Sequence, residues 1–233
     1  MAKEKSYHHI FFDLDRTLWD FDRNSEQALK LLYEKHEMQS KLSDSFENFL
    51  KVYKDQNAIL WGKYREGLIE KNDLRRDRFF LSFQDFGYED KKLALRFNDE
   101  YVESSSAQTH LMPGTIEVLD YLFPKYDLHV ITNGFVEAQT VKLDNCNLNR
   151  YFKQVIISDG LGYRKPDKRI FHHAMKMAGA RSANSLMVGD DYGPDVLGAK
   201  AVGMDQVFLE WQKEKANQAT YTIHSLRELM DIL

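Results

Sequence analysis

The sequence predicts an α/β protein, in which a doubly wound parallel sheet forms a Rossmann-like core that carries an inserted α-helical domain. Three observations support this fold class. Short apolar runs alternate with helix-period segments, which is typical of a parallel sheet covered by helices on both faces. One long stretch, residues 19–108, contains no strand-like run. The 233 residues are 43% hydrophobic and include only 4 Pro, so the chain can bury a sizeable core.

About five to six buried strands are expected, because the apolar runs are short and each stops at a polar or flexible residue. The runs occupy residues 8–15, 127–134, 153–160, 185–191 and 205–210, with a last short one at 220–225. Helices are expected between them at residues 114–123, 136–143, 168–178 and 195–202, and a closing helix at 226–233. Ser225 is placed to cap that closing helix.

Residues 19–108 are charged, amphipathic and helix-favouring throughout. They predict a compact bundle of helices, with segments at residues 25–37, 42–67, 71–85 and 90–104. Within the bundle, Arg75, Arg76 and Arg78 are expected on a solvated helix face. The chain should therefore form two domains, a core from residues 1–18 and 109–233 and a helical domain from residues 19–108.

Charge and cysteine content limit the cellular compartment and the partners that we expect for the protein. Lys and Arg number 32 against 36 Asp and Glu, so the formal net charge of −4 offers no basic field for a polynucleotide. The single cysteine, Cys146, cannot form an internal disulfide, which favours a reducing cytoplasm. No apolar run approaches the roughly 18 residues of a membrane span. We expect a cytoplasmic monomer or homodimer that binds neither nucleic acid nor membranes.

Acidic residues follow two of the expected strands, at the edge where parallel sheets bind ligands. Asp13 and Asp15 end the first run, and Asp190, Asp191 and Asp195 follow the fourth. An Asp pair alone is also common in turns. Acids from two strand ends, however, predict a shared site in the crevice.

Anion-binding groups are expected at the same edge. Thr132, Asn133 and Gly134 end the second run and supply a hydroxyl, an amide and a relaxed backbone, while Lys165 follows the third run. Several carboxylates facing one lysine would be costly in a partly dry crevice without a bound cation. With no His or Cys at ligand spacing, the sequence favours Mg²⁺ before Zn²⁺. Such an ion would also draw in a phosphate.

Four motifs occur in order along the chain: Asp13-x-Asp15-x-Thr17, Thr132-Asn133-Gly134, Lys165-Pro166 and Gly189-Asp190-(x)4-Asp195. This set resembles the haloacid dehalogenase-like hydrolases over nearly the whole chain, and the helical insert is similar to their type 1 cap. The stretch from Phe12 to Phe21, with Asn133-Gly134-Phe135, is similar to the branch of pyrimidine and noncanonical-nucleotide 5′-nucleotidases. Arg16 stands where many members have Gly, and Asp191 where many have Ser or Thr.

The resemblance implies a Mg²⁺-dependent phosphomonoester hydrolase with an aspartyl-phosphate intermediate. Asp13 would attack phosphorus, and Asp15 would protonate the leaving oxygen and then activate water. Thr132, Lys165 and backbone N–H groups around Asn133 and Gly134 would hold the phosphoryl oxygens. Lys165 would also neutralise Asp13.

The metal ligands that the resemblance implies are Asp13, the main-chain carbonyl of Asp15, and Asp190. Asp195 would orient a metal-bound water, and Asp191 could replace or assist it. The sequence leaves that choice open.

A nucleoside 5′-monophosphate is the expected substrate. Trp19, Tyr64 or Arg65 could read its base, although core packing is the commoner use of such aromatic side chains. The alternatives left open are a phosphatase of another metabolite, such as a sugar phosphate or phosphoglycolate, and a sugar-phosphate mutase. Dehalogenation is disfavoured, because that branch lacks an acid at the position of Asp15. A phospho-accepting signalling domain, of a different class, would be about half as long and would have no insert.

Overall fold

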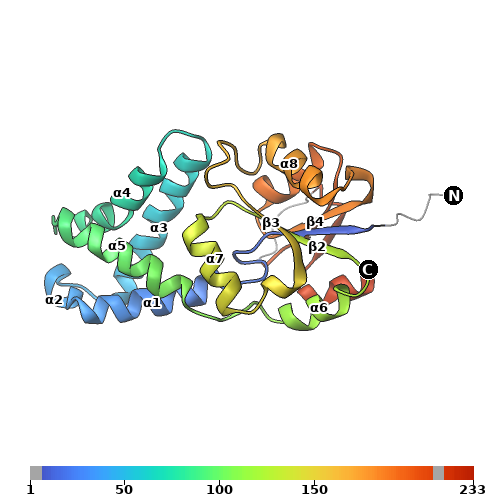
Figure 1. Ribbon diagram of the computed structural model, residues 1–233. Coiled ribbons are helices and arrows are strands. Elements are labelled where there is room, and N and C mark those ends of the chain that lie inside the picture. Colours follow the sequence, from blue (N-terminus) through green and yellow to red (C-terminus); the bar gives the residue numbers. More distant parts are fainter. Residues whose placement is uncertain (1–6, 212–217) are drawn as a thin grey trace. The chain divides into compact units, whose positions relative to one another are not determined.

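A parallel sheet lies at the centre of the larger part of the protein (Figure 1). The computed structural model describes residues 7–211 and 218–233. Within them the sheet has six strands in the order β3-β2-β1-β4-β5-β6, and every pairing is parallel. The strands are β1 (His9–Phe12), β2 (Asp127–Thr132), β3 (Phe152–Ile157), β4 (Ser185–Gly189), β5 (Asp205–Leu209) and β6 (Tyr221–Ile223). The doubly wound sheet predicted from the alternation of segments is confirmed.

Helices cover both faces of this sheet. They are α6 (Thr115–Leu122), α7 (Val136–Asn145), α8 (Lys168–Ala178), α9 (Gly198–Lys200) and α10 (Leu229–Ile232). Further helical turns of other types are η1 (Asn149–Tyr151), η2 (Ser182–Asn184), the π-helical η3 (Tyr192–Leu197) and η4 (Leu226–Glu228). Ser225 caps the closing helical segment as predicted, since its hydroxyl accepts from the backbone N–H of Arg227 at 3.3 Å.

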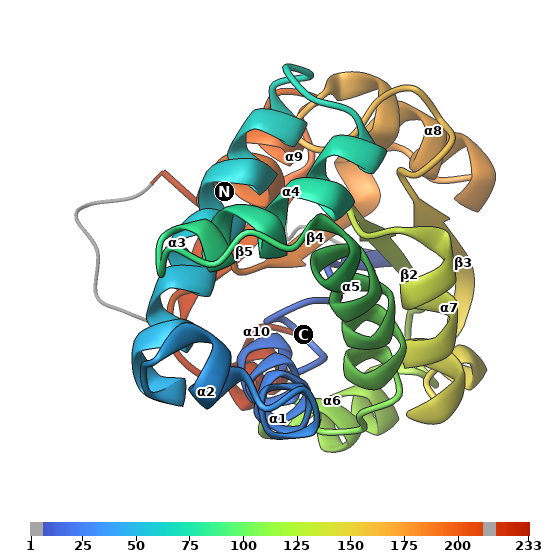
Figure 2. The ribbon, with the colours of Figure 1, turned by 90° about the vertical axis from the view of Figure 1, so that its left-hand side faces the viewer.

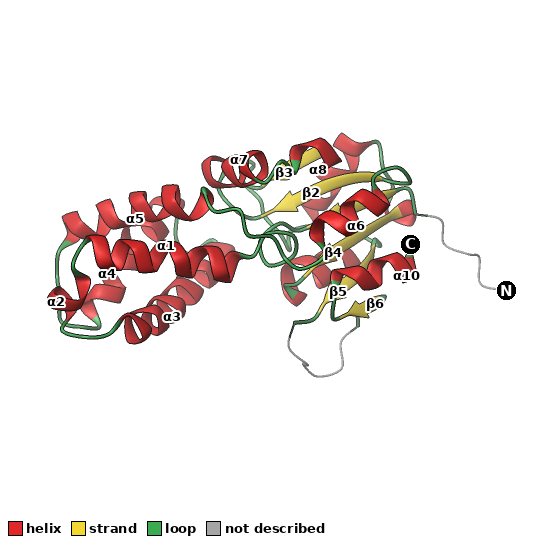
Figure 3. Ribbon diagram, turned by 90° about the horizontal axis from the view of Figure 1, so that it is seen from below, coloured by secondary structure: helices red, strands yellow, loops and turns green. Residues whose placement is uncertain are grey.

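The pleat of β1 divides the apolar side chains between two cores. Ile10 and Phe12 pack on one face with residues of α6, whereas Phe11 packs on the other with residues of α8. All three side chains are fully buried, because successive residues of a strand point to opposite faces. Figure 3 shows α6 and α10 lying against the first of these faces.

The chain forms two compact units, one from Met1–Phe21 and Thr109–Leu233 and the other from Asp22–Gln108. The second unit is helical, and its helices are seen in Figures 1 and 2. They are α1 (Phe21–Lys35), α2 (Met38–Leu42), α3 (Phe46–Arg65), α4 (Lys71–Gln84) and α5 (Lys91–Ser106). None of the helices in the described part of the chain is long and apolar enough to cross a membrane.

Aromatic rings fill the core of the helical unit. Phe49, Phe79, Phe83 and Phe97 are fully buried, and the ring of Tyr53 stacks on Phe79 with a centroid distance of 5.1 Å. These rings come from α3, α4 and α5, so the three helices share one apolar centre. The predicted segments pack as a bundle with its own core.

Two expectations for this unit are corrected by the structure. The segment 42–67 is not one helix, because Ser43 adopts a left-handed conformation with φ 54° and Ser45 caps a new helix by accepting from Asn48 N at 3.3 Å. Arg78 does not lie on a solvated face. Its side chain is buried, and its Nε donates to Asn98 Oδ1 at 2.8 Å. Arg76 remains largely exposed.

Candidate active site

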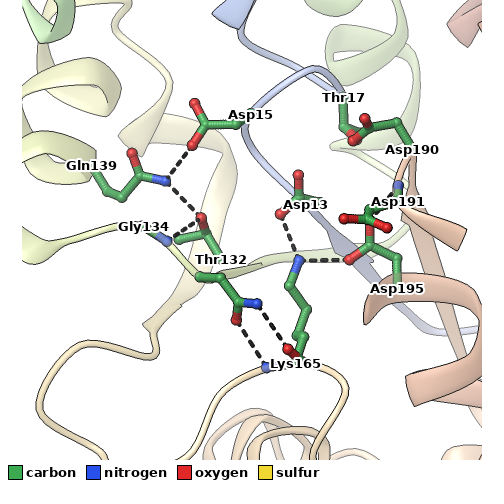
Figure 4. Close-up of polar contacts among 11 residues, drawn as sticks. Asp13, Asp15, Thr17, Thr132, Gly134, Gln139, Lys165, Asp190, Asp191 and Asp195 are labelled. Atoms are coloured by element: carbon green, nitrogen blue, oxygen red, sulfur yellow. Dashed lines mark hydrogen bonds and ion pairs between the residues drawn. The ribbon is translucent and has the colours of Figure 1, made fainter. Parts of the chain in front are cut away.

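The sheet brings three strand ends together at one edge. Chain order reverses between β1 and β4, and sheets of this type bind ligands outside the carboxyl ends of the strands at such a reversal. Asp13 directly follows β1, Thr132 ends β2 and Asp190 directly follows β4. The backbone N–H of Asp13 donates to the carbonyl of Val188 at 2.9 Å, which ties this acid to β4. The expected convergence of these residues is seen in Figure 4.

Three carboxylates form the centre of the site. Asp13, Asp190 and Asp195 each place one oxygen within 4.8 Å of the others. Asp195 reaches this cluster from the π-helical turn η3, and the hydroxyl of Thr17 donates to Asp190 at 3.1 Å. Gly189 leaves the space that Asp195 needs, because a Cβ at that position would lie 2.2 Å from Asp195 Oδ2.

Asp191 contributes to the site through its backbone. Its N–H donates to Asp195 Oδ2 at 3.1 Å, and its carbonyl accepts from the N–H of Asp195 at 2.9 Å. The carboxylate of Asp191 is not a member of the three-acid cluster found among the described residues. Of the two acids that the sequence left as alternatives, Asp195 is therefore the one that lies beside Asp13 and Asp190.

Lys165 is the cation of the cluster. Its ammonium lies 2.5 Å from Asp13 Oδ1 and 2.6 Å from Asp195 Oδ1, and the residue is only 2% exposed. Asn133 holds the backbone of Lys165 from both sides, since its amide donates to the Lys165 carbonyl at 2.9 Å and accepts from the Lys165 N–H at 2.8 Å. The side chain of Asn133 is thus engaged with the backbone of Lys165.

Burial and neighbouring carboxylates both disfavour the charged forms of the acids in this cluster. Burial raises the pKa of Asp13 to about 7 and that of Asp190 to about 8, and neighbouring carboxylates add to both effects. The pKa of Asp195 is also raised by burial. Burial alone would lower the pKa of Lys165, but the carboxylates of Asp13 and Asp195 outweigh it and raise that pKa.

A cation fits this arrangement. Three carboxylates against one ammonium leave an excess of negative charge that one divalent ion would neutralise. The donor atoms of the cluster are all carboxylate oxygens, the ligand type that a hard ion such as Mg²⁺ prefers. The expected metal site therefore agrees with the chemistry of the residues that the fold brings together.

Asp15 is turned toward helix α7 instead of toward the three acids (Figure 4). Its Oδ2 accepts from Gln139 Nε2 at 2.9 Å, and its Oδ1 lies 2.6 Å from Lys142 Nζ. Sequence reasoning missed both partners, because residues 136–143 were interpreted only as a helix covering the sheet. The signal available was a pair of long polar side chains at i and i+3, shortly after Thr132.

The residues expected to read a base lie in different surroundings. Trp19 is buried in the core of the first unit, with Lys142 Nζ 4.2 Å above its ring. Tyr64 is buried in the helical unit and meets Trp61 edge to face, with a centroid distance of 5.6 Å. Arg65 is exposed at the last position of α3. Trp19 and Tyr64 are thus buried, and Arg65 is the exposed member of the set.

The fold and the site together define a hydrolase built on a Rossmann-like sheet, with an acid cluster around a buried lysine at the reversal of strand order. The chain belongs to the haloacid dehalogenase-like hydrolases, whose family model matches residues 7–203.

Relatives within this family support the assignment. PynA, a pyrimidine 5′-nucleotidase of Streptococcus pneumoniae, is 31% identical over 97% of this chain and 95% of its own. A glyceraldehyde 3-phosphate phosphatase of Methanothermobacter thermautotrophicus is 30% identical over 90% of this chain and 88% of its own. The crystal structure of the HAD-hydrolase YfnB of Bacillus subtilis, bound to magnesium, matches with a TM-score of 0.90 and 26% identity over 98% of this chain and 99% of that one.

Proposed function

We propose that this hydrolase is a Mg²⁺-dependent phosphomonoesterase that acts through an aspartyl-phosphate, with a nucleoside 5′-monophosphate as its substrate class. The observation that carries the proposal is the position of Lys165, whose ammonium lies 2.5 Å from Asp13 and 2.6 Å from Asp195. A carboxylate nucleophile is thereby held beside a fixed positive charge, which a transferring phosphoryl group requires. The similarity to a pyrimidine 5′-nucleotidase supports the finer substrate class.

Two displacements make up the proposed reaction. Asp13 forms a bond to phosphorus while the bond to the leaving oxygen breaks, and Asp15 gives that oxygen its proton. Water then attacks phosphorus and passes a proton to Asp15, and the bond to Asp13 breaks to release inorganic phosphate. The Thr132 hydroxyl, the backbone around Asn133 and Gly134, and Lys165 would hold the phosphoryl oxygens throughout.

Asp13, Asp190 and the main-chain carbonyl of Asp15 would hold Mg²⁺. Asp195, or Asp191 in its place, would assist these ligands without binding the ion directly. The excess of carboxylate over ammonium charge and the raised pKa values of Asp13 and Asp190 support this assignment. When bound, the ion would add positive charge next to the phosphoryl oxygens.

The two domains would divide the work. The core, residues 1–18 and 109–233, would carry the chemistry, and the insert, residues 19–108, would select the substrate through side chains such as Tyr64 and Arg65. Trp19 would act through packing beneath Lys142. The cytoplasmic location, the monomeric or homodimeric state, and the lack of nucleic acid and membrane partners stay predictions.

Phosphate release from a panel of esters would test the proposal. The panel should contain nucleoside 5′-monophosphates, sugar phosphates including glyceraldehyde 3-phosphate, and phosphoglycolate, each with Mg²⁺ and with chelator. Fastest Mg²⁺-dependent turnover on a nucleotide would support the full proposal. Fastest turnover on glyceraldehyde 3-phosphate would favour the second candidate, a sugar-phosphate phosphatase, which the archaeal relative supports. Conversion of one phosphate-linked isomer into another would indicate a mutase, and modification only once per molecule would indicate a phospho-accepting domain.

A further inference from the structure

Helix α7 presents two buried polar side chains to one carboxylate. Gln139 and Lys142 lie three residues apart, so they project from the same side of the helix. Gln139 Nε2 donates to Asp15 Oδ2 at 2.9 Å, and Lys142 Nζ lies 2.6 Å from Asp15 Oδ1. Gln139 is fully buried and Lys142 is 6% exposed. Both oxygens of Asp15 are thus held by groups that solvent scarcely reaches.

Gln139 also connects Asp15 to Thr132. A side-chain amide nitrogen carries two hydrogens, and the second one is donated to the Thr132 hydroxyl at 2.6 Å (Figure 4). The reversed amide would direct its oxygen at the Asp15 carboxylate, so the charge of Asp15 sets the orientation of Gln139. Gly134 leaves room for this side chain, because a Cβ there would lie 2.3 Å from Gln139 Cδ.

The hydrogen bond from Gln139 determines whether the Thr132 hydroxyl can act as a donor or as an acceptor. A hydroxyl oxygen accepts two hydrogen bonds and donates one. Thr132 Oγ1 accepts from Gln139 Nε2 at 2.6 Å and from the backbone N–H of Gly134 at 3.3 Å. Its acceptor capacity is therefore used, and its own hydrogen is left to be donated. A phosphoryl oxygen bound at this strand end accepts hydrogen bonds, so it requires a donor such as this hydroxyl.

Burial of the Lys142 ammonium is unfavourable unless other interactions compensate for its lost hydration. An ammonium removed from water loses much of its hydration free energy, which an ion pair only partly restores. Here Asp15 and the face of the Trp19 ring, 4.2 Å away, provide the compensation. The two donors use about half of the acceptor positions of the Asp15 carboxylate, which leaves the remainder for the proton exchanged with substrate.

We propose that Gln139 and Lys142 are positioning residues that fix Asp15 as the proton donor to the leaving oxygen, with Gln139 also setting Thr132 as a hydrogen-bond donor. This inference rests on the proposed function, in which Asp15 protonates that oxygen while the bond to phosphorus breaks. Neither residue exchanges a proton with substrate. Their removal leaves the nucleophile, Asp13, and its contact with Lys165 in place.

The dependence of the rate on the leaving group tests this role. p-Nitrophenol leaves without protonation, whereas an alkyl alcohol needs a proton, so mispositioning of Asp15 affects the two ester classes differently. Lys142→Met and Gln139→Met remove the polar groups and keep much of the side-chain volume. For Lys142→Met we expect kcat/KM for ethyl phosphate to fall about a hundredfold or more, against less than about tenfold for p-nitrophenyl phosphate. Gln139→Met should show the same difference between the esters, together with a loss shared by both, because it also removes the hydrogen bond that orients the Thr132 hydroxyl.

Matched controls keep the outcome interpretable. Thr140→Ala changes an exposed residue of the same helix and should leave both rates near those of the unaltered protein. Thermal unfolding shows which variants fold. Because there are two independent substitutions, the test can still be made if one variant fails to fold. Equal losses on both esters in a folded variant would overturn the inference by showing that the pair only supports the fold. A chain of natural sequence that releases no phosphate from any ester would instead refute the proposed function.

Discussion

At the scale of single residues, the site contains side chains that hold its acids and its lysine in place: Gln139 and Lys142 contact Asp15, and Asn133 holds the backbone of Lys165. Asp13, Asp190 and Lys165 stand at strand ends, and strand ends can be recognised from apolar runs. Gln139 and Lys142 act from the buried side of a helix, and their spacing of three residues from each other, shortly after Thr132, was the signal that the sequence offered for them. Asn133 was expected to bind phosphate, and only the structure reveals that its amide holds the Lys165 backbone.

The proposed nucleophile gives the first prediction at this scale. Asp13→Asn keeps the shape of the side chain and an oxygen for Lys165, but it removes the anionic nucleophile. We expect kcat to fall by about a thousandfold or more with the fold intact. Phosphate release measures the loss, and thermal unfolding verifies the fold. Asp231→Asn, at an exposed acid of α10, serves as the control. Near-normal turnover of the Asp13 variant would contradict the mechanism.

The proposed Mg²⁺ site gives the second prediction at this scale. Excess chelator should abolish activity and Mg²⁺ should restore it, because the three acids share an uncompensated charge. Asp190→Ala should raise the Mg²⁺ concentration required for half-maximal activity more than it raises the KM for substrate, since Asp190 would contact the ion and not the ester. The two titrations are made on the same preparation. Full activity in excess chelator would rule out the metal assignment.

At the scale of elements, strands were easier to predict than the ends of helices. The six predicted runs became the six strands of the described sheet. Central strands such as β1 and β4 are buried on both faces, and such strands require a short continuous apolar run. The break near Ser43 was missed, because a left-handed serine has no reliable sequence signal. Arg78 was misplaced, although it lies four residues after the buried Leu74 and thus on the same helix face. The positive charge of Arg78 favours an exposed position, and the prediction followed that charge and not the spacing.

Strands β1 and β2 carry a buried histidine pair that should make folding depend on pH. His9 Nδ1 and His129 Nε2 are 3.2 Å apart, so at most one of these nitrogens can carry a proton. Burial lowers the pKa of His129 from 6.5 to about 4, with a further contribution from His9, and burial also lowers the pKa of His9. A buried His129 Nδ1 has no hydrogen-bond partner, which further disfavours a second proton on this ring.

The sign of the effect follows from these lowered pKa values. Below about pH 6.5 the unfolded chain binds protons on these rings more readily than the folded chain does, so the unfolding free energy falls as the pH is lowered from about 6.5 toward the folded-state pKa of His129, about 4. His129→Gln can still hydrogen-bond to His9 but does not titrate. Between about pH 7.5 and about pH 5, the unfolding free energy of the natural sequence should fall by about 1–2 kcal/mol more than that of the variant. Urea unfolding in chelator measures both, and parallel pH profiles would contradict the prediction.

At the scale of the whole molecule, each of the two compact units has a hydrophobic core of its own. The long gap between strand-like runs is the observation that predicts a helical insert, because a parallel sheet cannot continue through residues that form only helices. Which insert side chains would meet a substrate cannot be predicted in the same way. Helical periodicity identifies the apolar face of a helix, but it does not separate an exposed binding side chain from any other polar residue.

Arg65 provides the sharpest test of substrate selection by the insert. It is exposed at the end of α3, beside the buried Tyr64, so its replacement should leave the core of the helical unit intact. If Arg65 reads the base, Arg65→Ala should lower kcat/KM for nucleoside 5′-monophosphates by about tenfold to a hundredfold, the effect of one lost stacking or charge-assisted contact. Activity on p-nitrophenyl phosphate, which has no base, should change far less.

Arg76→Ala is the matched control for this experiment, because Arg76 is another exposed insert arginine whose partners, Asp73 and Asp77, lie within α4. It should leave both activities unchanged, since the ion pairs of Arg76 are local to one helix and exposed pairs contribute little to stability. A loss of equal size on the nucleotide and on p-nitrophenyl phosphate in the Arg65 variant would show that Arg65 supports the insert without reading a base. Selection of a nucleotide would then have to come from other insert residues, and the similarity to a 5′-nucleotidase would remain its main support.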